Sequence, residues 1–318
     1  MGAVAHQPFR EALAPDLHRL SLPHPAGFVN VYLLSGPDGI RLIDAGCDTE
    51  KSWWELNWHL DDLGLRAEEV VEVLLTHTHS DHIGLVPRLA ARAEFQVLVS
   101  AREVDLSGMT VACFDGDWLI RHGSPPAATE SRVRMQLPAG QRSVGDVEEF
   151  AFGSLELRVA TLSGHSPGLL SLVDRTRGLV FTSDHLMPVT TPLIAFADSP
   201  DDLVAQYLAG LDTLSENDPG ALVLPGHGRS FRRLHDRIDS VRLEVRERVA
   251  RFRAAVTDRV SAGEVSDRVG WSFPPGSRYV RNGSSVANAL AHLRHLERLG
   301  QITQSDGEDG FSFAPASN

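Results

Sequence analysis

The sequence has few cysteines, few lysines and no long hydrophobic run. Cys47 and Cys113 are the only cysteines among its 318 residues, which excludes a framework of disulfides and is typical of a reducing compartment. No run of about 18 apolar residues occurs, so we expect no membrane-spanning helix. The first eight residues lack the charged and apolar segments of a secretory signal. We therefore expect a cytoplasmic protein without a membrane partner.

Basic residues are outnumbered by acidic ones. The chain has 30 Lys and Arg against 42 Asp and Glu, a formal net charge of −12. Binding to a polyanion requires an excess of Lys and Arg, so we do not expect nucleic acid as a partner. The length and the 42% of hydrophobic residues allow a large α/β core and a smaller second unit. We expect a small-molecule substrate as the partner, and a homodimer is an alternative that the sequence leaves open.

Three histidines and one aspartate lie within six positions, directly after an apolar run at 70–75 that predicts a buried strand. Imidazole and carboxylate are ligands that suit zinc and similar divalent metals. His77 and His79 are two apart in extended chain, so they point the same way and can bind one ion. Asp81 and His82 follow where the chain bends into a helix predicted over 83–93, and they can hold a second ion nearby.

Three further candidate ligands each follow an apolar run that predicts a strand. They are His165 after 155–162, Asp184 after 178–181 and His227 after 222–224. If these strand ends meet at one edge of a sheet, all seven candidates come together. His185, next to Asp184, has two interpretations: a substrate-facing or proton-transfer role, or a structural one.

These blocks resemble the motif pattern of the metallo-β-lactamase-fold hydrolases over about residues 10 to 235. Asp44 matches the remaining motif, a structural aspartate beneath the site. The resemblance implies an αββα sandwich in the α/β class, with a dinuclear metal site similar to that of glyoxalase II. The implied metal ligands are His77, His79 and His165 for the first ion, Asp81, His82 and His227 for the second, and Asp184 as the bridge between them.

The resemblance also implies the chemistry. In such a site two divalent ions, zinc with iron or manganese as alternatives, would bridge and deprotonate a water that then attacks a carbonyl carbon. The predicted catalytic residues are Asp81, Asp184 and His185. The leading function is hydrolysis of an ester-type bond, a thioester or a lactone of a small acyl metabolite. The alternatives are an RNA or phosphodiester hydrolase and a non-hydrolytic lyase of the same fold.

The pattern along the chain predicts a catalytic domain over 1–233, interrupted by a helical insertion or lid at 105–140. Phe114 and Trp118 of this insertion suit the wall of an apolar pocket. The alternative is that they only hold the insertion onto the core. Residues 234–318 resemble the winged-helix-like domain attached to some members of the family. We expect a helix over 285–299 and a frayed end after 305.

Other side chains have open roles. Trp54 and Trp58 are i,i+4 neighbours on a helix predicted over 50–63, and we expect them in the core. His24 and Asn30 flank the first strand, near where substrate enters in relatives. His122 lies in the insertion. A functional role for these last three is a minor alternative to a structural one.

Overall fold

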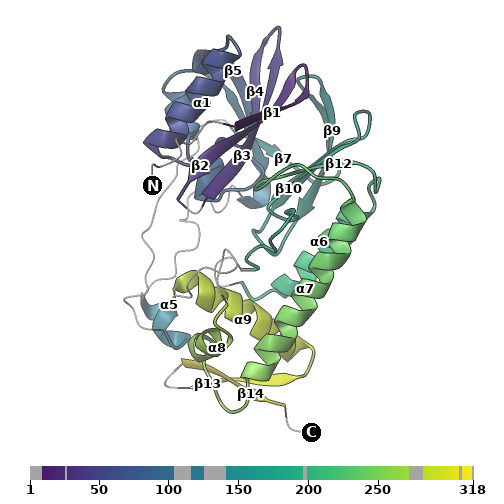
Figure 1. The fold of residues 1–318 in the computed structure, drawn as a ribbon. Helices are drawn as coiled ribbons and strands as arrows, with labels where there is room; N and C mark the ends of the chain where they lie inside the picture. The colour runs from purple at the N-terminus through teal and green to yellow at the C-terminus, as the bar shows by residue number, and fades with distance from the viewer. Residues whose placement is uncertain are drawn as a thin grey trace, which may run out of the picture.

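The computed structural model describes residues 9–25, 27–103, 116–124, 141–195, 199–271, 282–307 and 310–316. Two β-sheets stack against each other and carry helices on their outer faces (Figure 1). In the first sheet β1 to β4 are antiparallel, and the pairs from β4 to β7 are parallel. Its seven strands, in spatial order, are β1 (Phe9–Ala14), β2 (Leu17–His24), β3 (Gly27–Gly36), β4 (Gly39–Ile43), β5 (Val70–Leu74), β6 (Gln96–Ser100) and β7 (Arg142–Val144).

The second sheet has five strands, of which only β11 and β12 pair in parallel. Their connection contains a helix, as a parallel crossover requires. In spatial order the strands are β12 (Leu222–Pro225), β11 (Leu179–Ser183), β10 (Leu169–Asp174), β9 (Leu155–Leu162) and β8 (Glu149–Phe152).

Side chains alternate between the two faces of each strand, and this alternation builds the layers. On β5, Leu74 enters the cluster between the two sheets, whereas Val73 enters the cluster under the helices of the first sheet. On β11, Phe181 faces the other sheet and Val180 faces the helices of the second sheet. Three hydrophobic clusters therefore separate four layers, and the αββα sandwich expected from the resemblance is confirmed.

The helices follow their local signals. Thr49 caps α1 by accepting a hydrogen bond from the backbone of Ser52. The single helix expected over 83–93 is instead two short ones. Gly84 ends the first, and the second begins at Val86 with Pro87, which has no N–H to donate, in its first turn. The helices on the two sheets are α1 (Glu50–Asp62), the 3₁₀ turn η1 (Ala67–Glu69), α2 (Ser80–Ile83), α3 (Val86–Ala90), α6 (Leu203–Ser215) and α7 (Leu234–Ala255).

Trp54 and Trp58 are not in the core. Their exposed fractions are 57% and 40%, because α1 buries the polar Glu55 and His59 instead and turns the two indoles outward. The i,i+4 spacing correctly placed them on one face, but not on the inner face. In the described part of the chain no helix is both long and apolar enough to cross a membrane.

The tail and the described part of the insertion pack together at one end of the molecule (Figure 1). The end expected to fray forms a two-stranded sheet, because Ile302 and Phe313 are buried in a shared cluster. Trp118 is 5% exposed and lies in the same cluster, so it packs the insertion onto the tail. The elements here are α5 (Gly116–Arg121), α8 (Ala262–Val269), α9 (Gly283–Arg298), β13 (Ile302–Gly307) and β14 (Gly310–Pro315).

The helix α7 belongs to both halves of the molecule. Ile238 and Val241 pack in the cluster on the second sheet, whereas Phe252 packs in the tail cluster. The predicted boundary at 233/234 coincides with the start of this helix. That residues 234–318 form a separate winged-helix-like domain stays a prediction.

Candidate metal centre

The predicted ligands converge at one edge of the sandwich, where several strands end. His77 and His79 follow β5, Asp184 follows β11 and His227 follows β12. His165 lies in the loop between β9 and β10. Parallel strands bring their carboxyl ends to the same edge, and this placement unites residues that are up to 150 positions apart in the chain.

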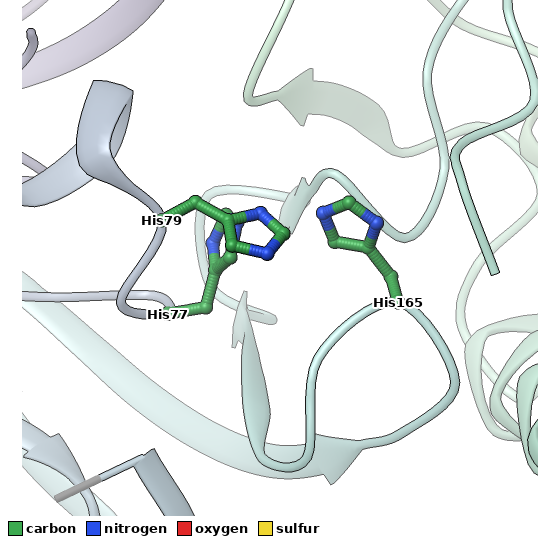
Figure 2. Close-up of side chains that lie close together, drawn as sticks. All are labelled: His77, His79 and His165. Atoms are coloured by element: carbon green, nitrogen blue, oxygen red, sulfur yellow. The ribbon is translucent and has the colours of Figure 1, made fainter. Parts of the chain in front are cut away.

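Three histidines form the first group. The Nε2 of His77 lies 2.9 Å from the Nδ1 of His79, and the rings of His79 and His165 are 4.6 Å apart between centroids. Each offers one nitrogen, and the three nitrogens lie within 4.8 Å of one another. Figure 2 shows the rings of His77 and His79 approaching that of His165 from the opposite loop. This arrangement suits a single ion held between them.

Asp184 lies between the first group and the other ligands. Its Oδ2 is 3.6 Å from the Nε2 of His165 and 3.2 Å from the Nε2 of His227, and its Oδ1 is 3.5 Å from the Nε2 of His82. Asp81 completes the second group, with its Oδ2 3.3 Å from the Nε2 of His227. The carboxylate of Asp184 therefore contacts histidines of both groups, as a bridging ligand must.

The ring nitrogens that face the centre are available because the opposite nitrogens are already bonded. The Nδ1 of His82 donates to Asp44 over 2.8 Å, that of His165 to the carbonyl of Leu193 over 2.8 Å, and that of His227 to the carbonyl of Phe28 over 2.7 Å. Such bonds fix the tautomer and aim the other nitrogen of a metal-ligating histidine.

Three buried atoms at the centre have no hydrogen-bond partner among the described residues. They are the Nε2 of His82, the Nε2 of His165 and the Oδ1 of Asp184. A buried polar atom without a partner is costly, so an arrangement of several that face one another calls for a ligand. Imidazole nitrogens and carboxylate oxygens are donors for divalent metal ions, and the residues fit such ions.

Electrostatics keep the carboxylates ionised. Burial opposes ionisation of Asp184, but His227 and His82 outweigh it and hold its pKa well below the usual value. In the first group, burial lowers the pKa of His165 to about 4, so this imidazole is neutral near pH 7. Burial also lowers the pKa of His227, but Asp184 outweighs it and raises the pKa to about 10. A metal ion binding at His227 would therefore displace a proton.

Asp44 lies beneath the centre, as the resemblance implied. It is buried, and besides His82 it accepts hydrogen bonds from the backbone N–H and the hydroxyl of Thr76. Its φ of 61° lies in the left-handed region, which a non-glycine residue adopts at some cost. The aspartate thus ties the strand that precedes His77 to the ring of His82.

The loop that carries His227 is fixed by side chains that sequence reasoning underrated or missed. Asn30 donates to the carbonyls of Pro225 and Gly228, over 2.8 and 2.9 Å, and Tyr32 donates to that of Pro225 over 2.7 Å. The buried guanidinium of Arg19 contacts both Asn30 and Gly228. Asn30 therefore has the structural role, and it holds the loop in place.

Glu103 is a second residue that sequence reasoning missed. Its carboxylate, 1% exposed, accepts from the backbone N–H of Thr78 over 3.1 Å and from its hydroxyl over 2.7 Å. Its other oxygen accepts from the backbone N–H of Gly168 over 2.8 Å. Thr78 lies between two ligands, and Gly168 is three residues from His165. Glu103 therefore ties together the two loops of the first group.

We expect Glu103→Gln to lower the affinity for the first metal ion about 10–100-fold, which is the effect typical of residues that orient ligands. One carboxylate oxygen becomes an NH₂ group, which cannot accept from Thr78 or Gly168. A chelator competition would measure the affinity for each ion. Glu72→Gln is the matched control, because it removes an ion pair with Arg41 that lies away from the ligand loops. Lower thermal stability with unchanged affinity for the first ion would contradict this role.

His185 does not face the ligands. Its ring is fully buried and stacks on Tyr207 of α6, with centroids 4.5 Å apart, and its Nε2 donates to the Tyr207 carbonyl over 3.1 Å. Burial lowers its pKa to about 3, so the ring stays neutral. The catalytic role predicted for His185 does not agree with this position. The chain turns after Ser183, where the N–H of His185 donates to the carbonyl of Thr182 over 3.0 Å, and the His185 ring lies under α6.

The remaining candidates separate into three kinds. His24 lies at the centre, in contact with His227. His122 is buried in the tail cluster, where it stacks on Trp118. Phe114 lies outside the described residues, so the pocket-wall prediction is addressed only by Trp118, whose burial favours the alternative of packing.

An arginine of α7 supports the loop next to the centre. Arg248 of α7 is buried and donates to the carbonyl of Pro192 over 2.9 Å. The next residue, Leu193, is the one whose carbonyl accepts from His165. A side chain of α7 thus supports the loop that orients a predicted ligand.

Comparison with known proteins agrees with this geometry. Residues 24–227 match the model of the metallo-beta-lactamase superfamily, and the chain belongs to this superfamily. A probable metallo-hydrolase of Bacillus subtilis (strain 168), YqgX, is 28% identical over 202 residues, which cover 63% of this chain and 84% of the relative. The chain is thus a metallo-hydrolase of this superfamily, with a cluster of histidines and aspartates suited to divalent metal ions.

Two further matches differ in extent. The crystal structure of a beta-lactamase domain protein from Burkholderia ambifaria superposes with a TM-score of 0.81 at 25% identity, covering 98% of this chain and 97% of that one. The similarity therefore includes the tail. A hydroxyacylglutathione hydrolase of Jannaschia sp. (strain CCS1) is 28% identical over 165 residues, which cover 52% of this chain and 51% of the relative.

Proposed function

We propose that the protein hydrolyses an ester-type bond, a thioester or a lactone of a small acyl metabolite, with two divalent metal ions. The observation that carries the proposal is the position of Asp184 between two groups of ligands. Zinc is the first choice for a set of imidazoles and carboxylates, and iron and manganese are the alternatives. The hydroxyacylglutathione hydrolase among the relatives supports an acyl thioester as substrate.

When bound, the two ions would supply a water activated at neutral pH and a polarised carbonyl. His77, His79 and His165 would hold one of them, and Asp81, His82 and His227 the other. Asp184 would set the spacing between the two positions. Ionised and partly exposed at the rim, Asp81 can accept a hydrogen bond from the attacking water and aim it at the acyl carbon.

The second candidate is a phosphodiester hydrolase of the same fold. The same ligand set suits an in-line displacement at phosphorus, which also uses two ions. The net charge of −12 favours a small acyl substrate, because it gives no general attraction for a polyanion. A turnover screen of the metal-loaded protein over thioesters, lactones, phosphodiesters and RNA would separate the candidates. Turnover of RNA without turnover of any acyl compound would overturn the proposal.

We expect close to two metal ions per chain. The seven predicted ligands form two groups that share Asp184, so each group can hold an ion. Elemental analysis after reconstitution and removal of excess metal measures the ratio. A value that stays at one with excess metal would rule out the dinuclear site, whichever substrate is found.

A further inference from the structure

His24 lies beside the second group of ligands. It is the last residue of β2, and its ring centroid is 5.3 Å from that of His227. One nitrogen of His24, one carboxylate oxygen of Asp81 and one nitrogen of His227 lie within 4.8 Å of one another. The nitrogens of the three histidines in the first group also lie within this distance of one another.

The backbone around His24 makes this position part of the centre. His24 pairs with Gly27 at the end of the β2–β3 hairpin. The next residue, Phe28, supplies the carbonyl that accepts from the Nδ1 of His227. One end of the hairpin therefore holds the ring of His227 through its Nδ1 and also places a second imidazole beside that ring. A packing role alone would not require two nitrogens and a carboxylate oxygen to converge.

We propose that His24 is a further ligand of the second metal position, in addition to Asp81, His82 and His227. This inference rests on the proposed dinuclear site. With Asp184 as the bridge, the second position would have five protein donors and the first would have four. The two positions would then differ in preference, because zinc favours four ligands whereas manganese and iron accept five or six.

Cobalt(II) is a suitable probe, because its visible absorption weakens as its coordination number rises. The metal-free protein would be titrated with cobalt(II) alone, and both dissociation constants would be measured by chelator competition. We expect His24→Ala to lower the affinity for the second cobalt(II) ion about tenfold or more, which corresponds to at least about 1.4 kcal/mol. The visible absorption of that bound ion should become stronger. The affinity for the first ion should change by less than about threefold, or about 0.7 kcal/mol.

His24→Phe keeps a ring against His227 but removes both nitrogens, so it should behave as His24→Ala does. The control is His235→Ala, which removes a partly buried histidine of α7 that is bonded to the carbonyl of Asn217. Melting of the metal-free variants shows that they fold.

The outcomes separate the two proposals. If both His24 variants keep the affinity and spectrum of the second ion, or weaken only the first, His24 is not a ligand. That result would leave the dinuclear hydrolase intact. If cobalt(II) binds twice and depends on His24, but no ester-type compound is turned over, the ligand stands and the proposed substrate class fails.

Discussion

Replacing Asp184 with Ala is expected to abolish binding of both metal ions and to lower kcat/KM at least about 1,000-fold, or about 4 kcal/mol. Among the described residues, Asp184 is the carboxylate that contacts all three of His82, His165 and His227. Without it, two positively charged ions would come together with no anion between them. Elemental analysis and steady-state kinetics on the same preparation would measure the two effects.

Two further variants make this result specific. Asp184→Asn keeps the shape of the side chain and removes its charge, so it should retain the fold and still lose metal. His185→Ala changes the next residue, which packs under α6. It should lower the melting temperature and keep both ions. Equal losses of activity in Asp184→Ala and His185→Ala, with metal retained in both, would show that His185 acts in catalysis and that we have misplaced its role.

Replacing Gly226 with Ala is expected to have the second largest effect. A Cβ at this position would lie 2.1 Å from the Oδ1 of Asp184 and 2.9 Å from the Cε1 of His82. The space is taken by the metal centre itself, so the loop carrying His227 or the carboxylate must move. We expect about 1–3 kcal/mol of lost stability from overpacking, together with loss of metal.

Gly220→Ala is the control for this substitution. Gly220 precedes the same strand, and an added Cβ would meet only the carboxylate of Asp218, at 3.4 Å. Chemical denaturation and metal analysis of both variants would test the expectation. A Gly226→Ala protein with two tightly bound ions would mean that the loop can shift without cost, against the bonds from Asn30 and Tyr32 that hold it.

The sequence predicted the fold, and it predicted that the candidate ligands lie close together, because both signals are local. The ligand blocks each follow an apolar run, and the strands before them, which belong to both sheets, end at one edge of the sandwich. Asp44 was identified by the resemblance to the family motif. Glu103 could not be found in this way, because it acts on Thr78, 25 positions away, and on Gly168, 65 positions away. Only the folded chain brings these segments together.

Two errors have different physical causes. Trp54 and Trp58 were expected in the core from their i,i+4 spacing, but this spacing shows only that they share a face of the helix. On its inner face α1 buries Glu55 and His59 instead. The tail after residue 305 was expected to fray because it is short and terminal. Its alternation of Phe311, Ser312 and Phe313 is in fact a strand pattern, which pairs with β13 and buries Phe313.

The length of α7 gives the molecule a mechanical property. Twenty-two residues of helix form a rod of about 33 Å, and this rod begins seven residues after His227. One end of this helix packs on the second sheet and the other end packs in the tail. Between them, Arg248 donates to the Pro192 carbonyl in the loop that orients His165. A force on the tail would therefore tilt α7 as a whole. This tilt would shift the loop behind His165 and the segment after His227 together, so the tail and the metal centre are mechanically coupled.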